Sequence, residues 1–146
     1  MATNLFTIGY EGINLDDFVA QLKNSAINCL IDVRRIPLSR KPGFSKSALT
    51  QKLAHENIDY VHFKELGSPE STRAQLKSDR NYDKFFSAVR QYLSTKTDIL
   101  KEASGHVIRK NCCLMCFERQ AGKCHRTLVA SLIKQQRGNS LRIINL

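Results

Sequence analysis

The sequence has no tryptophan, only three prolines and no long apolar run. A helix that spans a bilayer needs about 20 mostly apolar residues, and no segment approaches that length, so we expect no membrane span. The first residues, Met1-Ala2-Thr3-Asn4, lack the basic segment and apolar stretch of a secretory signal. We therefore expect a cytoplasmic protein.

Cysteine is present in an odd number, five in all. Small secreted domains that depend on disulfides carry an even set of cysteines and a signal peptide. Because both features are absent, the composition argues against a disulfide framework and predicts reduced thiols. A chain of 146 residues buries enough surface to form a core without such crosslinks.

Acidic residues are scarce, since 23 lysines and arginines outnumber 13 aspartates and glutamates and give a net charge of +10. From residue 33 to residue 55 there is no acidic residue, and six basic residues fall in this stretch: Arg34, Arg35, Arg40, Lys41, Lys46 and Lys52. Two prolines and a glycine mark residues 34–44 as a loop, which we call the basic loop. The surplus favours an anionic partner such as nucleic acid or a nucleotide; a merely solubilising surface is the alternative.

Short apolar runs alternate with amphipathic segments along the chain. The runs predict five strands, near residues 5–8, 29–33, 58–63, 112–117 and 141–144. Four helices are expected between or after them, from residues 14, 45, 82 and 124. This alternation predicts one α/β domain over residues 1–146, with a mostly parallel five-stranded sheet and helices on both faces, as in Rossmann-like or flavodoxin-like folds.

The segment from residue 64 to residue 79 is rich in polar and turn-forming residues. It is long for a plain connection, so we interpret it as a functional loop or lid, with disorder as the alternative.

Ligands of such sheets bind beyond the carboxyl ends of the strands. That rule brings five segments to one edge: residues 9–12, 32–44, 62–67, 116–118 and 124–126.

Cys124 is the candidate nucleophile because it is expected at a helix start, beside a histidine and an arginine. Positive charge and free N–H groups at a helix start lower the pKa of a thiol. Glu118 or His62 would then act as the acid or base. A non-catalytic binding module that uses the same edge is the competing hypothesis, so the sequence leaves open whether the protein is an enzyme.

The same edge predicts an anion site for a phosphate-containing ligand, either a nucleotide or nucleic acid. Its candidate ligand-binding residues are Gly9, Tyr10, Asp32, Arg34, Arg35, Arg40, His125 and Arg126. For Asp32, a structural ion pair with Arg34 is an equal alternative.

Structural zinc is a further alternative, because Cys116, Cys124 and His125 are ligand types that zinc prefers. Thiols within a strand lack the tight turn that usually presents paired ligands, so we predict neither a metal nor another cofactor.

Several ordered motifs span nearly the whole chain. They are Thr7-Ile8-Gly9-Tyr10-Glu11-Gly12, Asp32-Val33-Arg34-x2-Pro37-x-Ser39, Tyr60-x-His62-x3-Leu66-Gly67, Cys116-x-Glu118 and Cys124-His125-Arg126. As an ordered set they resemble the DUF488 family. The resemblance implies a small bacterial or archaeal α/β protein without an assigned molecular function. Ser68 departs from the family pattern, which often has a second glycine there.

Overall fold

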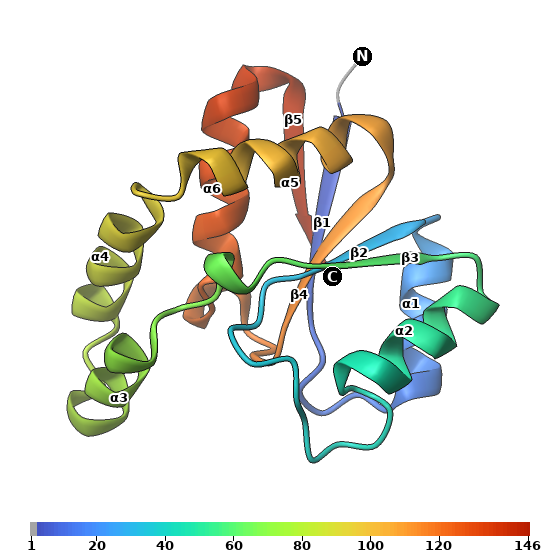
Figure 1. The fold of residues 1–146 in the computed structure, drawn as a ribbon, viewed down its shortest axis with the longest axis horizontal. Coiled ribbons are helices and arrows are strands. Elements are labelled where there is room, and N and C mark those ends of the chain that lie inside the picture. Colours follow the sequence, from blue (N-terminus) through green and yellow to red (C-terminus); the bar gives the residue numbers. More distant parts are fainter. Residues whose placement is uncertain (1–2) are drawn as a thin grey trace.

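Five parallel strands form the centre of the computed structural model, which describes residues 3–146 (Figure 1). The strands are β1 (Thr3–Gly9), β2 (Cys29–Asp32), β3 (Asp59–His62), β4 (Cys112–Cys116) and β5 (Leu141–Asn145). They are ordered β3-β2-β4-β1-β5, and every neighbouring pair is parallel. The predicted α/β fold with a five-stranded parallel sheet is confirmed.

The central strands β2 and β4 are apolar apart from Asp32 at the end of β2, because both of their faces are covered. All residues of β2 and β4 are buried, whereas the edge strands β3 and β5 carry exposed positions. Cys29, Cys112 and Cys113 belong to the buried part of these central strands and are free thiols. For these three residues, small size suits the tightly covered sheet.

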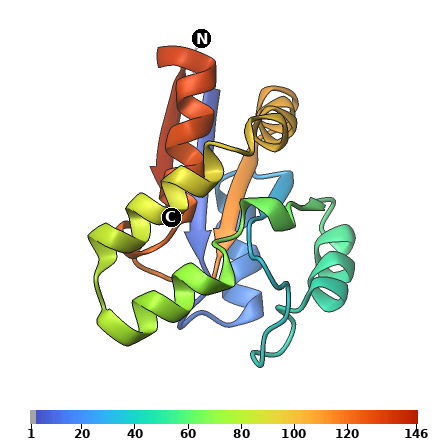
Figure 2. The same ribbon diagram turned by 60° about the vertical axis from the view of Figure 1, so that its left-hand side comes forward.

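Helices cover both faces of the sheet, as predicted. On one face lie α1 (Leu15–Asn24) and α2 (Lys46–His55), whose apolar residues pack against Ile8, Leu30 and Met115. The other face packs against α4 (Tyr82–Leu93), α5 (Thr97–Arg109) and α6 (Arg126–Arg137). Figure 2 shows the second group of helices from another side.

The structure has two helices that the sequence does not predict, in addition to the four that it does. Residues 64–79 are not an irregular loop: they form a 3₁₀ turn, η1 (Lys64–Leu66), and α3 (Glu70–Asp79). None of the residues in α3 is buried, so the helix has no apolar stripe that periodicity would reveal. The polar stretch through Ser104 and Gly105 lies within α5, where Leu100, Ala103 and Val107 are buried.

The start of α6 also differs from the prediction. A 3₁₀ turn, η2 (Ala121–Lys123), follows β4, and α6 begins at Arg126 with His125 at its N-cap. Cys124 therefore precedes the helix. The remaining 3₁₀ turn, η3 (Gly138–Ser140), connects α6 to β5.

The neighbouring strands β1 and β4 lead to helices on opposite faces. After β1 the chain enters α1, and after β4 it enters α6. Where connections diverge in this way, the carboxyl ends of the strands leave a crevice between them. No helix within residues 3–146 combines the length and apolar character needed to cross a membrane.

Candidate functional site

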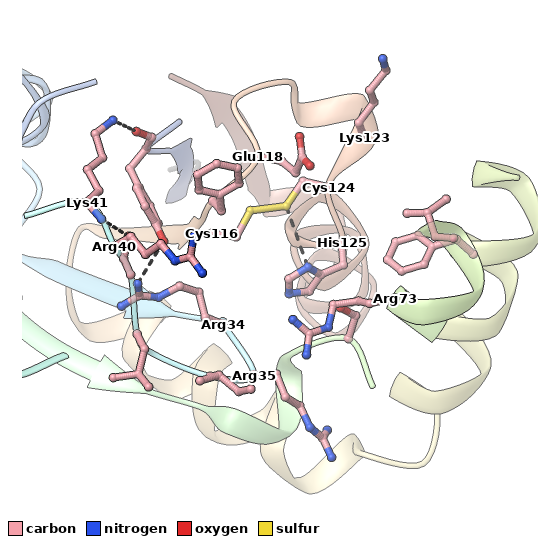
Figure 3. Close-up of a pocket in the computed structure, with 18 residues that line it drawn as sticks. Arg34, Arg35, Arg40, Lys41, Arg73, Cys116, Glu118, Lys123, Cys124 and His125 are labelled. Atoms are coloured by element: carbon pink, nitrogen blue, oxygen red, sulfur yellow. Dashed lines mark hydrogen bonds between the residues drawn. A yellow bond between two sulfur atoms is a disulfide. The ribbon is translucent and has the colours of Figure 1, made fainter. Parts of the chain in front are cut away.

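A cavity of about 610 Å³ lies at this carboxyl edge (Figure 3). Its wall comes from the end of β1, the basic loop, the segment around α3 and α4, the end of β4 and the residues before α6. Of the residues that the sequence singled out, Tyr10, Arg34, Arg35, Arg40, Glu118, Cys124 and His125 line it. Gly9, Asp32, His62 and Arg126 lie outside the lining.

Positive charge dominates the wall of the cavity. Its basic residues are Arg34, Arg35, Arg40, Lys41, Arg73 and Lys123, whereas Glu118 is the one acidic residue of the lining. Burial raises the pKa of Glu118 from its ordinary value, and the nearby Glu11 carboxylate adds to the rise. The lining of the cavity is therefore predominantly cationic.

Apolar side chains also reach the cavity from positions exposed to solvent. Ile36, Leu38 and Phe117 are 51%, 70% and 48% exposed. Phe117 meets Tyr10 edge to face with 5.4 Å between the ring centroids, and Tyr10 in turn stacks on Phe44 at 4.5 Å. The cavity thus combines a cationic wall with an aromatic one.

Asp32 and Arg34 form a buried ion pair behind the cavity wall, in which Arg34 Nη2 donates to Asp32 Oδ2 at 2.8 Å. Tyr60 donates its hydroxyl to the same oxygen at 2.5 Å, and Arg34 Nη1 donates to the Tyr10 hydroxyl at 3.2 Å. Burial, together with the Asp32 charge, raises the pKa of Tyr60. Asp32 therefore orients Arg34, in agreement with the structural alternative for this pair.

The remaining cations differ in how firmly they are held. Arg35 donates to the Tyr92 hydroxyl at 3.0 Å, and Lys41 donates to the Tyr10 carbonyl oxygen at 3.0 Å. Among the described residues, the side chains of Arg40 and Arg73 have no hydrogen bond or ion pair within the protein. These two guanidinium groups are the ones free to bind a ligand.

The basic loop is held in shape by Ser39 and Ser45. The Ser39 N–H donates to Ser45 Oγ at 3.0 Å, and that hydroxyl donates back to the Ser39 carbonyl at 3.2 Å. The Ser39 hydroxyl accepts the N–H of Lys41 at 3.1 Å. The loop therefore presents Arg40 from an ordered backbone.

Gly9 was predicted to bind a ligand and His62 to act as an acid or base, but both contact the protein's own backbone. The N–H groups of Tyr10 and Glu11 donate to the carbonyls of Cys116 and Phe117, so they are paired and not available to an anion. A side chain at Gly9 would collide with the backbone of Glu118. His62 Nε2 lies 2.7 Å from the carbonyl oxygen of Arg34, where it supports the start of the basic loop.

Cys116 and Cys124 are joined by a disulfide in the cavity wall (Figure 3). The prediction of reduced thiols is therefore wrong for these two residues, because the fold places the end of β4 against the turn before α6. Cys124 in this form has no free thiol. His125 Nδ1 lies 3.9 Å from Cys124 Sγ, and Nε2 lies 2.9 Å from the carbonyl oxygen of Val33.

Arg126 is fully buried beneath the disulfide. Its guanidinium donates to Cys116 Sγ at 3.2 Å, to the carbonyl of Arg119 at 3.2 Å and to the carbonyl of Glu118. Its Nε has no hydrogen-bond partner. Arg126 is therefore directed at a sulfur and not, as predicted, at a ligand in the cavity.

The zinc alternative is not favoured by the arrangement of side chains. Across residues 3–146, no group of three or more His, Cys, Asp or Glu side chains is placed to hold a metal ion. His125 already directs one ring nitrogen at a backbone carbonyl.

Residues 14–133 match the family described as "Domain of unknown function DUF488". The chain belongs to the DUF488 family. Searches of curated proteins and of solved structures give no match. The DUF488 match includes the basic loop, the disulfide and Arg126, whereas Gly9 and Tyr10 precede it.

Two residues of the cavity wall, Arg73 and Phe117, are not among the site residues predicted from the sequence. Arg73 comes from α3, which lacks any apolar periodicity, so nothing in the sequence placed it near the basic loop. Phe117 was assigned to the end of a strand, but β4 ends at Cys116 and leaves the ring exposed. An apolar residue directly after a buried strand was the one available signal.

Proposed function

We propose that the cavity binds one nucleotide unit of a nucleic-acid strand, or a free nucleotide. The observation that carries this proposal is the combination of six basic residues and one acidic residue with exposed apolar side chains on the same wall. A ligand that fits has separate anionic and flat apolar parts. Nucleotides meet this description, whereas a simple sugar phosphate lacks the flat apolar part.

Phosphate is assigned to Arg40 and Arg73, because a guanidinium can hold a phosphate with two parallel hydrogen bonds. Both side chains are exposed and lack partners among the described residues, so binding breaks no existing interaction. Arg34 contributes charge from a fixed position, since Asp32 already occupies its hydrogen-bonding face.

The base is assigned to the aromatic wall. Phe117 is backed by the Tyr10 and Phe44 rings, which fix its orientation. Bases stack on such rings without regard to sequence. The proposal therefore predicts little sequence preference and a preference for unpaired strands.

The test is the binding of a fluorescent single-stranded oligonucleotide at several salt concentrations. We expect the Arg40→Gln/Arg73→Gln variant to bind at least tenfold more weakly at low salt and to reduce the slope of log K against log salt by about 1.4, which corresponds to two lost phosphate contacts. The control, Arg90→Gln/Arg142→Gln, removes the same charge from exposed residues outside the cavity.

Equal loss in the two double variants would mean that only net charge matters and would overturn the assignment to the cavity. Absence of binding by the unaltered protein to oligonucleotides and to mononucleotides would overturn the proposal itself.

A further inference from the structure

Arg126 carries a buried charge without a carboxylate partner. None of the ion pairs among the described residues includes it, and its hydrogen bonds go to two carbonyls and to Cys116 Sγ. An isolated buried charge is costly unless an opposite charge or a full set of hydrogen bonds compensates it. Neither is present here, because Nε is also unpartnered.

Cys116 is placed to supply the missing negative charge. Its sulfur accepts from Arg126 Nη1 at 3.2 Å, and a thiolate is stabilised by an adjacent arginine. In the disulfide this sulfur is neutral. After reduction, a Cys116 thiolate would form the ion pair that Arg126 lacks.

Other acidic groups are less suited to this role. Cys113 does not line the cavity, and burial raises the pKa of its thiol, so it stays neutral. Glu118 offers Arg126 its backbone carbonyl and forms no ion pair with it in residues 3–146.

Cys124 has a different neighbour. Burial lowers the pKa of His125 to about 4, so the ring is neutral at pH 7. When Nε2 donates its hydrogen to the Val33 carbonyl, Nδ1 has a lone pair directed toward Cys124 Sγ. His125 is therefore a hydrogen-bond acceptor that positions the Cys124 thiol, and the Val33 carbonyl orients the ring.

We propose that Cys116 and Cys124 are a redox-active dithiol pair that exchanges with small anionic disulfides, with Cys116 as the attacking thiolate. This inference does not rest on nucleotide binding. It also moves the nucleophile from Cys124, the sequence-based candidate, to the sulfur that faces Arg126.

The exchange proceeds in two steps. The Cys116 thiolate attacks one sulfur of a substrate R–S–S–R, forming a mixed disulfide and releasing R–S⁻. The Cys124 thiol then loses its proton to solvent and attacks Cys116 Sγ, which forms the Cys116–Cys124 bond and releases the second R–S⁻. The substrate gains two electrons, the protein dithiol loses two, and reduction by two thiols follows the reverse path.

The class of substrate follows from access and charge. Cys116 and Cys124 are each 3% exposed as whole residues, and both line the cavity. The charged groups that face the cavity are the six basic residues of its wall and Glu118. Tyr10 and His125 are the other titratable groups along it. A small disulfide with carboxylates fits this wall, and a cationic disulfide does not.

The first test measures thiol reactivity in the reduced protein. We expect iodoacetamide at pH 7 to label Cys116 at least about tenfold faster than Cys124, the matched internal control, because both residues line the cavity and both are 3% exposed. Peptide mapping by mass spectrometry reads out each site. Labelling of Cys116 no faster than that of Cys124 would overturn the proposal.

Variants then separate the two roles. Cys124→Ser should retain fast Cys116 labelling and trap the mixed disulfide. Arg126→Met should move the pH midpoint of Cys116 labelling upward; should this variant not fold, the comparison of Cys116 with Cys124 in the unaltered protein still decides the question. His125→Asn should leave Cys116 labelling unchanged but slow closure of the disulfide, and equal rates of closure would refute the role of His125.

Substrate charge is tested with glutathione disulfide, which is anionic, and cystamine, which is cationic. We expect glutathione disulfide to oxidise the reduced protein about tenfold faster at low salt, with the difference shrinking as salt is added. Faster reaction with cystamine would overturn the assigned class. Thiol labelling uses no nucleotide, and oligonucleotide binding by the unaltered, oxidised protein uses no free thiol, so failure of one proposal is distinguishable from failure of the other.

Discussion

Asp32 holds Arg34 through three side-chain hydrogen bonds of 2.8 to 3.1 Å, with both residues buried at the carboxyl end of β2. The Asp32 carboxylate also accepts the N–H of Arg34 at 3.0 Å. This one side chain therefore sets both the direction of the arginine and the path of the chain into the basic loop.

Replacing Asp32 by Asn should destabilise the protein strongly, because Arg34 would remain buried without its counter-ion. Removing one partner of a buried pair costs about 3–5 kcal/mol. Urea unfolding measures the change. Asp16→Asn is the matched control, since Asp16 is exposed and lies 3.9 Å from Lys52; we expect a change below about 1 kcal/mol there. Similar losses in the two variants would contradict the structural role of the Asp32 pair.

Stability should fall as the pH drops from about 6.5 to about 4, in part because of His125. Burial lowers its folded pKa from 6.5 to about 4, so between these values the unfolded chain binds a proton that the folded protein does not. The contribution is complete above pH 6.5 and amounts to about 1–3 kcal/mol. Urea unfolding across this pH range measures it.

His125→Asn should flatten that pH dependence, whereas His55→Gln, at an exposed histidine of α2, should leave it unchanged. Glu118 has a raised pKa and contributes with the opposite sign, but it is present in all three proteins. An unchanged pH profile in His125→Asn would show that the ring is not buried in its neutral form.

The strands were predictable because burial on both faces imposes continuous apolar runs, as in residues 29–31 and Cys112–Cys116. The residues that line the cavity were harder to predict from the sequence. α3 carries Arg73 to the cavity without burying any residue, so hydrophobic periodicity contains no trace of it. The Cys116–Cys124 contact depends on a 3₁₀ turn, η2, whose sequence has no distinctive signal.

The orientation of Arg126 was also not predictable from the sequence. Its position beside His125 suggested an anion ligand, but the side chain turns into the protein and is fully buried. Direction within a helix start is set by what packs around it, here the carbonyls of Glu118 and Arg119. A sequence motif can place such a residue near a site, but it does not determine whether the side chain points into the cavity or into the protein interior.

Gly9→Ala should destabilise the protein by about 1–3 kcal/mol, as overpacking typically does. An added Cβ would lie 2.8 Å from the Arg119 Cα and closer still to the carbonyl of Glu118, and this backbone cannot rotate away. Gly122→Ala is the control, because nothing lies within 4 Å of its added Cβ. Thermal unfolding compares the two; equal stability would contradict the close approach at Gly9.

Phe117→Ala should weaken oligonucleotide binding about tenfold, since stacking contributes about 1–3 kcal/mol per base. An oligonucleotide of abasic residues keeps the phosphates but lacks the bases, so the same variant should bind it as the unaltered protein does. Ile108→Ala controls for loss of an exposed apolar side chain, because Ile108 is 55% exposed and lies outside the cavity. If Phe117→Ala weakens both oligonucleotides equally, the ring does not stack on a base, and the aromatic wall has no part in recognition.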